Sequence, residues 1–240
     1  MKLLPLHLPT PAENLAADEA VLDQCEAGES DETLVLWEPR ETFVVVGYAN
    51  KLATEVNVAA CEKNRIPIFR RCTGGGTVAQ MAGGLNYSLI LRIDEAGPTR
   101  NITTANQFIM ERNRQAIATL LPQSKISIRG HTDLCLGDVK FAGNAQRRRK
   151  HFLLFHGTLL LNCDLNVISD LLLMPSLEPD YRVGRPHQEF VTNLNLPAAK
   201  VKQALAQEWN AAEELTNPPL EKIRALARAK YSTAEWNFKF

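Results

Sequence analysis

Apolar residues along the chain recur with two different periods, and each period predicts a different kind of element. Short apolar runs bounded by Gly, Pro or charged residues are typical of strands, whereas apolar residues three and four positions apart are typical of helices. The strand pattern occurs at Thr33–Trp37, Thr42–Val46, Ile66–Phe69, Leu85–Leu91, Ile126–Ile128, His131–Leu136, Val139–Ala142 and Phe152–Leu161. The helix pattern occurs at Glu55–Lys63, Thr103–Leu121, Ile168–Leu173, Ala198–Trp209 and Leu220–Lys230, while Pro175–Leu196 is proline-rich and irregular. Since neighbouring strands are mixed with helices, this order predicts an α+β fold with mixed, mostly antiparallel sheets flanked by helices.

A further helix is predicted near the N-terminus from its end signals. Thr10 is a typical N-cap, Pro11 suits the first helical position, and Glu13 follows the cap by three residues, as a capping box requires. Gly28 is expected to end this helix, because glycine adopts the left-handed conformation found after helix ends.

A glycine-rich loop between two predicted strands is the first candidate site. Arg70 and Arg71 precede three consecutive glycines in the segment Thr73–Thr77, and Gly83 and Gly84 follow. Glycine loses more backbone freedom on folding than any other residue, so such a loop suits close approach of the backbone to a ligand. Successive backbone N–H groups there form an anion-binding concavity, and arginine adds a planar fork for phosphate or carboxylate. The loop therefore predicts an anion or nucleotide cradle, and the alternative is a glycine-rich hairpin with two solvated arginines.

Two established phosphate-binding motifs do not describe this loop. No Gly-Lys-Ser/Thr follows the glycines, which excludes a P-loop. The Gly-x-Gly-x-x-Gly spacing and the following helix start of a dinucleotide-binding turn are also missing.

A second candidate segment is the hairpin around a Gly137-Asp138 turn. Lys140 lies within an apolar strand, where a lysine either extends outward to solvent or points at a ligand. The small residues of Ala142–Ala145 favour close approach of another group. Asp133 lies across the turn, where it either holds a cation, a hydroxyl or Lys140, or forms a surface salt bridge. His156, in the middle of the next strand, is either a ligand contact or a core histidine.

Composition narrows the class of protein. Lys plus Arg and Asp plus Glu both number 27 among 240 residues, so nothing global indicates binding to nucleic acid or to an anionic membrane. No apolar run approaches the roughly 20 residues that a membrane helix needs. The five cysteines are scattered without CxxC, and there is no HExxH. These features predict a cytoplasmic protein with reduced thiols and no structural zinc site.

Together these segments resemble the lipoate–protein ligase family, whose catalytic domain belongs to the superfamily of biotin ligases and lipoyl or octanoyl transferases. The resemblance rests on Glu13–Ala16, Asp18-Glu19, Leu36–Pro39, Val44–Gly47, Arg70–Val78, Gly84–Ser88, Asp133-Leu134, Lys140–Gln146, His156–Leu160, Val191–Leu194 and Glu235–Asn237. Its most specific part is the Arg-Arg-x-Thr-Gly-Gly-Gly element paired with Lys-x-x-Gly-x-Ala. The resemblance implies a biotin/lipoate ligase-type catalytic domain over residues 1–197, with residues 198–240 as a helical extension packed on it.

The family implies that ATP and lipoate form lipoyl-AMP, which a lysine of a lipoyl-carrier domain then attacks. Lys140 is the implied catalytic residue, bridging the phosphate and the acyl carbonyl. The other residues implied to bind ATP or lipoyl-AMP are Arg71, Gly75, Gly76, Thr77, Val78, Ala79, Asn86, Asp133, Gly143, Asn144, His156 and Thr158. Val78 and Tyr87 are implied to line the acyl pocket, and Asp133 is the implied ligand of Mg²⁺.

The resemblance also implies partners, and two departures from the family pattern qualify it. The expected acceptors are an apo lipoyl domain of a dehydrogenase E2, a glycine-cleavage H protein or a specialised lipoyl-binding protein. Gln80-Met81 stands where the family often has His-Asp, which puts that histidine's role in doubt. Many ligases continue with an accessory domain after the Glu-Trp-Asn element, so we expect a separate accessory subunit, use of ready-made adenylate, or incomplete ligase activity.

Three other functions compete with the ligase. An octanoyl or lipoyl transferase would use a cysteine thioester and no ATP, with Cys72 or Cys135 as the candidate nucleophile. A biotin ligase is disfavoured because its Gly-Arg-Gly-Arg loop is absent. A non-catalytic homologue that holds lipoyl domains is opposed by the intact Arg71, glycine triplet and Lys140.

Overall fold

Two mixed sheets organise the computed structural model, which describes residues 1–240. The larger sheet contains, in order, β11 (Glu213–Glu214), β1 (Lys2–Pro5), β2 (Thr33–Trp37), β6 (Gly84–Arg92), β10 (Phe152–Leu160), β9 (Val139–Arg148), β8 (Asp133–Leu136) and β7 (Ile126–Arg129). The smaller sheet contains β4 (Ile68–Arg70), β3 (Phe43–Val46) and β5 (Val78–Gln80). Pairing is antiparallel from β2 to β7, whereas β1 is parallel to β2 and β11. The predicted α+β fold with mixed, mostly antiparallel sheets is confirmed.

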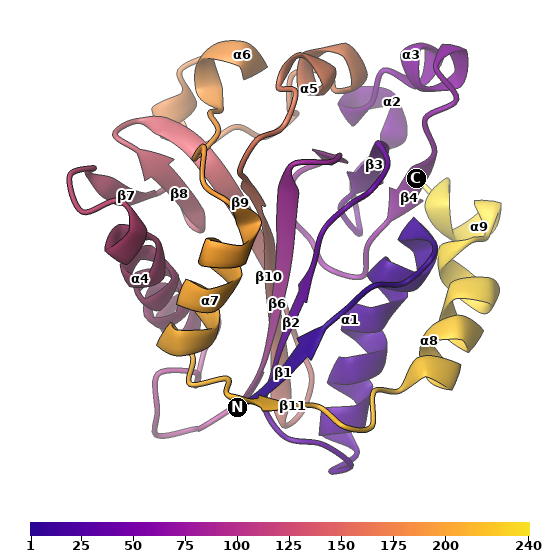
Figure 1. Cartoon of the computed structure of the whole chain (residues 1–240). Helices are drawn as coiled ribbons and strands as arrows, with labels where there is room; N and C mark the ends of the chain where they lie inside the picture. The colour runs from indigo at the N-terminus through magenta and orange to yellow at the C-terminus, as the bar shows by residue number, and fades with distance from the viewer.

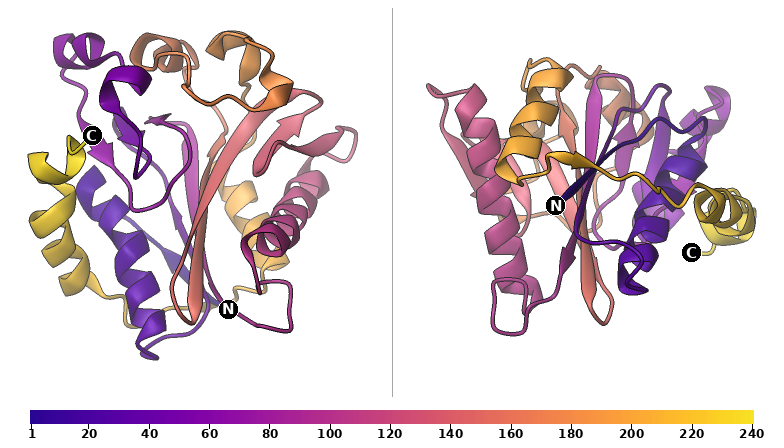
Figure 2. Two further views of the ribbon diagram at one scale, coloured as in Figure 1. Left: turned by 180° about the vertical axis from the view of Figure 1, so that it is seen from behind. Right: turned by 60° about the horizontal axis from the view of Figure 1, so that its bottom comes forward.

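Helices cover both faces of the larger sheet (Figure 1). On one face lie α4 (Ile102–Leu120) and α7 (Ala198–Glu208), and on the other lie α1 (Pro11–Glu26) and α8 (Leu220–Leu226), which continues into the π-helical turn η2 (Ala227–Tyr231). The views in Figure 2 show the same three-layer arrangement from behind and from below. The short helices are α2 (Leu52–Glu55), α3 (Val58–Lys63), α5 (Asn166–Leu171), η1 (Asp180–Arg182), α6 (His187–Phe190) and α9 (Ala234–Asn237). Residues 198–240 thus pack on both faces and add β11 to the sheet edge.

Strand β6 illustrates how the larger sheet is buried on both sides. Successive side chains of a strand point to opposite faces, so Leu85 and Leu89 join the core under α4 and α7, while Ile90 joins the core under α1. The polar Asn86 and Ser88 are also buried. Since buried polar groups require hydrogen-bond partners, these two residues indicate a polar site within the sheet.

Several predicted boundaries differ from the structure. The helix predicted at Glu55–Lys63 begins only at Val58, as α3, because Val56 is extended and Asn57 caps it, while Glu55 is the last residue of α2. The hairpin strand predicted at Val139–Ala142 continues to Arg148, because Gly143–Arg148 pair with β10. Strands β1, β5 and β11, of four, three and two residues, were not predicted. Helix α1 keeps its predicted capping box. No helix of the protein combines the length and the apolar character that crossing a bilayer demands.

Helix α1 carries a buried carboxylate that joins three parts of the chain. Glu19 accepts hydrogen bonds from Lys230 Nζ at 2.6 Å and from the Tyr231 hydroxyl at 2.7 Å. Arg147 Nη1, at the end of β9, lies 3.3 Å from the same carboxylate. Burial alone would raise the pKa of Glu19, but the hydrogen bonds and charges of these partners lower it below its ordinary value of 4.5. The carboxylate therefore clamps α1 to η2 and β9.

We expect Glu19→Gln to destabilise the protein by about 3 kcal/mol, at the lower end for breaking a buried ion pair. Because the folded-state pKa of Glu19 is depressed, its contribution is present above pH 4.5 and is lost as the pH falls below that value. Urea unfolding at a series of pH values would measure both effects. Glu213→Gln is the matched control, because Glu213 pairs with Lys2 on the exposed surface and should change stability little. Equal unfolding midpoints for wild type and Glu19→Gln at neutral pH would contradict the clamp.

Candidate active site

One cavity of about 830 Å³ lies between the smaller sheet, strands β6, β9 and β10, and the segment from Leu172 to Val191. Its volume falls in the range of roughly 300–1,000 Å³ typical of small-molecule sites. Its lining includes Lys140, Tyr87 and every residue predicted to bind nucleotide: Arg71, Gly75, Gly76, Thr77, Val78, Ala79, Asn86, Asp133, Gly143, Asn144, His156 and Thr158. The structure therefore brings the predicted site residues together, and their individual roles remain predictions.

The glycine loop is held in shape by Arg71. Gly75 has φ +85°, a left-handed conformation that favours glycine. The Arg71 guanidinium donates to the carbonyls of Gly74 at 2.5 Å and Gly76 at 2.7 Å, and also to Thr73 Oγ1 and Val45 O. Burial lowers the pKa of Arg71 to about 10. The donors of Arg71 are thus used mainly to fold the loop.

The neighbouring Arg70 has a structural position away from the cavity. Its side chain is fully buried and donates to the carbonyls of Gly47, Asn50 and Asn237. Asn237 Oδ1 accepts from the Arg70 backbone N–H. Arg70 therefore ties α9 to the chain that follows β3, and the adjacent arginines have different tasks.

Lys140 lines the cavity from β9 and belongs to a short series of polar contacts. Its Nζ is 2.8 Å from Asp133 Oδ1, and the Tyr181 hydroxyl donates to Asp133 Oδ2 at 2.8 Å. A Cβ at Gly143 would lie 2.7 Å from Lys140 Nζ. Glycine at position 143 thus makes room for the ammonium group, which is directed along the cavity wall by Asp133. The predicted pairing of Lys140 with Asp133 is confirmed.

A second series of hydrogen-bonded side chains holds the N-terminal side of the glycine loop. His156 Nε2 lies 2.7 Å from Thr73 Oγ1, and His156 Nδ1 lies 2.6 Å from Asp18 Oδ2. Ser88 Oγ donates to the other oxygen of Asp18 at 2.5 Å. This chain links α1, β6 and β10 to the loop, so His156 is a partnered residue at the cavity wall. The sequence singled out His156 but gave no signal for its pairing with Asp18.

Gln80, which replaces the family's usual histidine, is part of a closed amide network. Its Nε2 donates to Asn86 Oδ1 at 3.0 Å and to Thr158 Oγ1 at 2.8 Å, while Asn86 Nδ2 donates back to Gln80 Oε1 at 3.0 Å. The amide groups of Gln80 and Asn86 satisfy each other inside the cavity wall. Asn86 therefore has its side chain engaged by protein.

Asn144 and Tyr87 form a third network toward α4. The Tyr87 hydroxyl donates to Asn144 Oδ1 at 2.5 Å and accepts from Asn113 Nδ2 at 2.8 Å. A Cβ at Gly157 would lie 1.7 Å from Asn144 Oδ1, so glycine at position 157 is needed beside this amide. Burial raises the pKa of the Tyr87 hydroxyl well above its ordinary value. Tyr87 thus supplies a neutral, mainly apolar wall.

All five cysteines are buried and none lines the cavity. Burial raises the pKa of the Cys72 thiol, and Cys72 lies beside Glu19 and Arg147 rather than in the cavity. Burial also raises the pKa of Cys135, whose Sγ lies 3.6 Å from the Tyr181 hydroxyl. Thiolate is the nucleophilic form of cysteine, so neither residue is arranged for attack on an acyl group.

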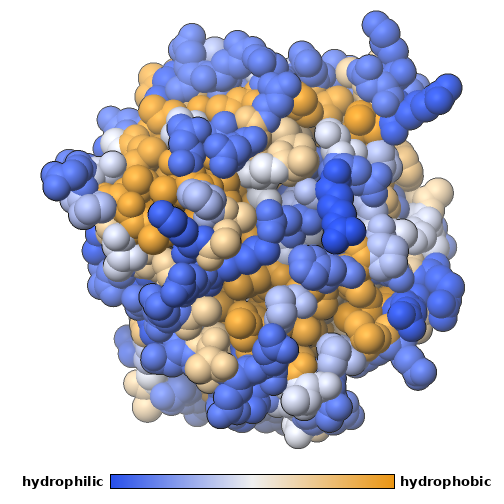
Figure 3. Space-filling model, viewed as in Figure 1, coloured by the Kyte–Doolittle hydropathy of each residue, from blue (hydrophilic) through white to orange (hydrophobic).

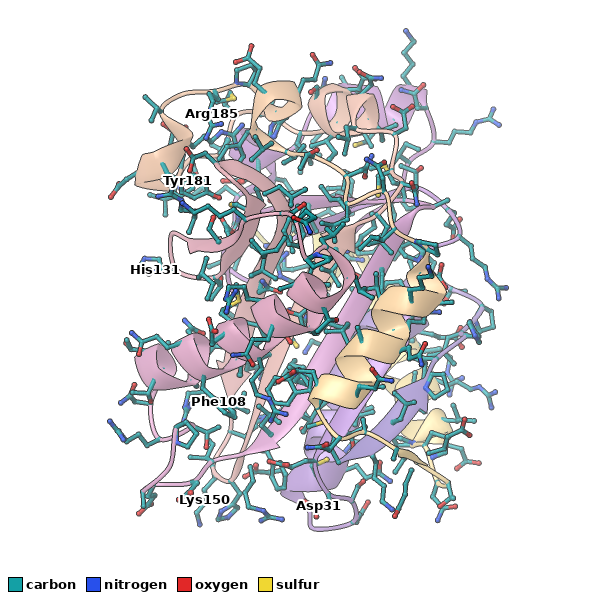
Figure 4. The ribbon with its side chains drawn as sticks, turned by 60° about the vertical axis from the view of Figure 1, so that its left-hand side comes forward. Asp31, Phe108, His131, Lys150, Tyr181 and Arg185 are labelled. Carbon is teal, nitrogen blue, oxygen red and sulfur yellow. The ribbon has the colours of Figure 1, made fainter.

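The segment predicted as irregular, Pro175–Leu196, forms one whole side of the cavity. It supplies Tyr181, Arg182, His187 and Phe190 to the lining. Figure 4 shows Tyr181 and Arg185 on this segment, close to His131 in the β7–β8 turn, whereas Lys150 and Asp31 lie at the far end of the molecule. None of these four lining residues was predicted as a site residue, because arginine and histidine in an irregular segment look the same in sequence as solvated ones.

The predicted Mg²⁺ site is not formed by protein side chains alone. No group of three or more His, Cys, Asp and Glu residues is arranged to hold a metal ion. Both oxygens of Asp133 already accept from Lys140 and Tyr181. Since Mg²⁺ usually takes one or two carboxylates together with substrate phosphates, Asp133 fits only as a single ligand of an ion that arrives with a nucleotide.

A glycine loop and a lysine that line the same cavity are typical of an enzyme domain that handles an activated acyl or phosphoryl group. The family model described as the lipoyl protein ligase A/B catalytic domain matches residues 10–210, and the chain belongs to this family. It is an enzyme of the lipoate ligase and octanoyltransferase type.

Named relatives include both activities of the family. Lipoate-protein ligase A subunit 1 of Thermoplasma acidophilum is 29% identical, covering 93% of this chain and 90% of its own length. Octanoyltransferase LipM of Geobacillus kaustophilus is 26% identical, covering 95% of this chain and 94% of its own length. Ligases and transferases therefore both occur among these relatives, at similar sequence identity to this chain.

Solved structures share the whole fold. A bipartite lipoate protein ligase from T. acidophilum, studied with its E2 lipoyl domain, has a TM-score of 0.83 at 25% identity and covers 99% of this chain and 95% of its own. A lipoate-protein ligase A bound with ATP has a TM-score of 0.83 at 27% identity, with 99% and 98% coverage. A T. acidophilum protein with bound lipoic acid has a TM-score of 0.82 at 26% identity, with 99% and 98% coverage.

Proposed function

We propose that this enzyme is an ATP-dependent lipoate–protein ligase, which converts lipoate to lipoyl-AMP and transfers the lipoyl group to a lysine of a carrier domain. The observation that carries the proposal is a single cavity lined by both the glycine loop and Lys140, with no cysteine on its wall. The relatives bound to ATP and to lipoic acid support the same substrates.

In the first step a lipoate carboxylate oxygen attacks the α-phosphorus of ATP, and pyrophosphate leaves. Negative charge grows on the phosphate oxygens, which fixed N–H donors and cations stabilise best when water is excluded. The N–H groups of Gly75, Gly76 and Thr77 and the ammonium of Lys140 are the groups proposed for that task. Arg71 acts by holding the loop, through its bonds to Gly74 and Gly76.

In the second step the amine of the acceptor lysine attacks the acyl carbon, and AMP leaves. Lys140, bridging phosphate and carbonyl oxygens, stabilises the tetrahedral intermediate and the departing phosphate. Val78, Tyr87 and the other apolar residues of the lining are proposed to enclose the acyl chain. Mg²⁺, bound with the triphosphate and Asp133, would neutralise charge on the leaving pyrophosphate.

The proposed acceptor is an apo lipoyl-carrier domain, with a separately encoded accessory subunit as a further partner. A relative named as subunit 1 and a bipartite ligase studied with its E2 lipoyl domain support this arrangement.

Mass spectrometry of an apo lipoyl domain tests the proposal directly. The domain is incubated with this protein and lipoate, with ATP present or omitted, and with an octanoyl-carrier donor as a separate arm. A gain of one lipoyl mass that requires ATP is expected. Acyl transfer from the carrier donor without ATP would replace the ligase with a transferase.

We expect Cys72→Ala and Cys135→Ala to retain lipoylation activity within about twofold of wild type, because both thiols are protonated, buried and outside the cavity. Rates of carrier lipoylation, measured beside melting temperatures, check this. A loss of acyl transfer in either variant with an unchanged melting temperature would favour a cysteine thioester mechanism instead.

A further inference from the structure

Arg182 is a buried cation on the cavity wall without a closely bound carboxylate. Its side chain is only 4% exposed, and the residue lines the cavity. Its Nε donates to Arg185 O, and its Nη2 lies 3.4 Å from both Met174 Sδ and His187 Nδ1. All of these are neutral acceptors, and Nη1 donates to no protein atom. The nearest carboxylate oxygen, Glu178 Oε2, lies 3.8 Å from Nε, beyond the usual length of an N–H···O hydrogen bond.

A second cation, Arg185, shares the aromatic ring on which Arg182 packs. The guanidinium of Arg182 packs over the Phe190 ring at 4.6 Å, and Arg185 packs over the same ring at 5.2 Å. Burial lowers the pKa of His187, and the charges of Arg182 and Lys140 act in the same direction. Arg182 and Lys140 therefore both act on His187 electrostatically. A buried charge without a partner is unfavourable, so an anion that entered here would remove that cost.

Arg182 differs in this respect from Arg71 and Arg129, the other two arginines on the cavity wall, since Arg129 forms an ion pair with Asp138. The donors of Arg71 are directed at loop carbonyls and a threonine hydroxyl. The triphosphate of ATP carries several negative charges, and Lys140 with the loop amides accounts for the phosphate that reacts. The remaining phosphates need a cation that the protein has not already used, and Arg182 is such a cation.

We propose that Arg182 binds the terminal, pyrophosphate-forming phosphates of the nucleoside triphosphate and releases them as inorganic pyrophosphate. The proposal rests on the ligase function and adds a second phosphate subsite to it, on the wall formed by η1 and α6. The planar guanidinium presents parallel N–H donors that match phosphate oxygens. The next residue, Val183, has φ +52° and is 79% exposed, whereas Arg182 is buried on the cavity wall.

Calorimetric titration with inorganic pyrophosphate tests this subsite without any turnover. We expect Arg182→Gln to weaken pyrophosphate binding by about 10- to 100-fold, the size expected for losing a hydrogen bond to a charged group. Arg182→Lys should recover part of the affinity. Glu178→Gln, which removes the one nearby negative charge, should bind pyrophosphate more tightly than wild type. Unchanged affinity for pyrophosphate in Arg182→Gln would overturn the subsite. If Arg182→Gln fails to fold, weaker pyrophosphate binding in Glu178→Gln than in wild type would overturn it instead.

Arg185→Gln is the matched control. Arg185 carries the same charge, lies in the same segment and packs over the same ring, that of Phe190. Arg185 donates to Asp138 O and Tyr181 O and does not line the cavity. It should bind pyrophosphate as wild type does, and an equal loss there would overturn the proposal in favour of a general charge effect.

Kinetics separate this subsite from the proposed function itself. In Arg182→Gln the KM for ATP in adenylate formation should rise, while transfer from preformed lipoyl-AMP to the carrier should stay at the wild-type rate. Equal loss in both steps would overturn the assignment to the terminal phosphates. If Arg182→Gln weakens pyrophosphate binding but the wild-type protein forms no adenylate, the result would contradict the ligase function and support the subsite.

Discussion

Lys140→Ala should abolish most adenylate formation, lowering its rate by about 10²–10³-fold, the cost of removing one group that stabilises charge in a transition state. Lys140 is the only lysine in the cavity lining, and its Nζ lies 2.8 Å from Asp133 Oδ1. The fold should survive, because the side chain is partly exposed and such ion pairs contribute about 1 kcal/mol or less. Release of pyrophosphate in the presence of lipoate and ATP measures the effect.

Lys150→Ala is the control for this variant. Lys150 is an exposed lysine in the turn between β9 and β10, at the far end of the molecule from Tyr181 and Arg185 (Figure 4). It should form adenylate at the wild-type rate. A Lys140→Ala protein that is folded and equally active would refute the role of Lys140 and remove the main chemical argument for the ligase.

Gly143→Ala should lower adenylate formation by about 10- to 100-fold without touching any reacting atom, because misplacing a catalytic group by about 1 Å costs on this scale. The new Cβ would lie 2.7 Å from Lys140 Nζ and 2.8 Å from Cε, closer than carbon and nitrogen atoms pack. The end of a flexible lysine can move, so the backbone of β9 should stay in place and stability should change little. Pyrophosphate release and the melting temperature, measured on the same sample, give the two readings.

A double-mutant cycle distinguishes this explanation from general damage to the strand. If the methyl group acts only by displacing Lys140, Gly143→Ala should add almost nothing to the loss in Lys140→Ala, so the two effects should be strongly non-additive. Additive losses would mean that position 143 acts through a different route.

Local chemistry made part of this site predictable from the sequence. The glycine triplet after Arg71 and the small residues after Lys140 are costly unless another group comes close. Gly143 and Gly75 are indeed positions where a Cβ would meet Lys140 or Arg71. The capping box of α1, the hairpin turn at Gly137 and the central strands were likewise determined by residues near one another in the chain.

The rest depended on contacts between distant segments. Asp18, Thr73 and His156 form one hydrogen-bonded chain although they come from three separate elements. The wall that carries Arg182 and Phe190 has short helices without a clear apolar period, and its arginines are indistinguishable by sequence from solvated ones. Arg147 and Arg148, in the basic run Arg147–Lys150, lie in β9, where Arg147 pairs with the distant Glu19.

Figure 3 shows hydrophobic residues exposed at the upper left of the molecule, the side on which Figure 1 draws β7, β8 and β9. Leu177, at 90% exposure, and Val183 contribute exposed apolar side chains to the segment Pro175–Leu196. Large exposed hydrophobic residues next to a cavity commonly mark contact with a ligand or partner.

The position of β1 has a consequence for how the chain acquires its structure. Lys2–Pro5 lies between β2 and β11, and its contact with Glu213 spans 211 positions of the sequence. During synthesis β1 emerges well before its outer partner β11, because 211 positions separate the paired residues of the two strands. Contacts between residues so far apart form slowly because the intervening chain must first be brought together. The outer edge of β1 is therefore open to pairing with other chains until β11 has been synthesised, and nascent chains with such unpaired strand edges are prone to aggregate.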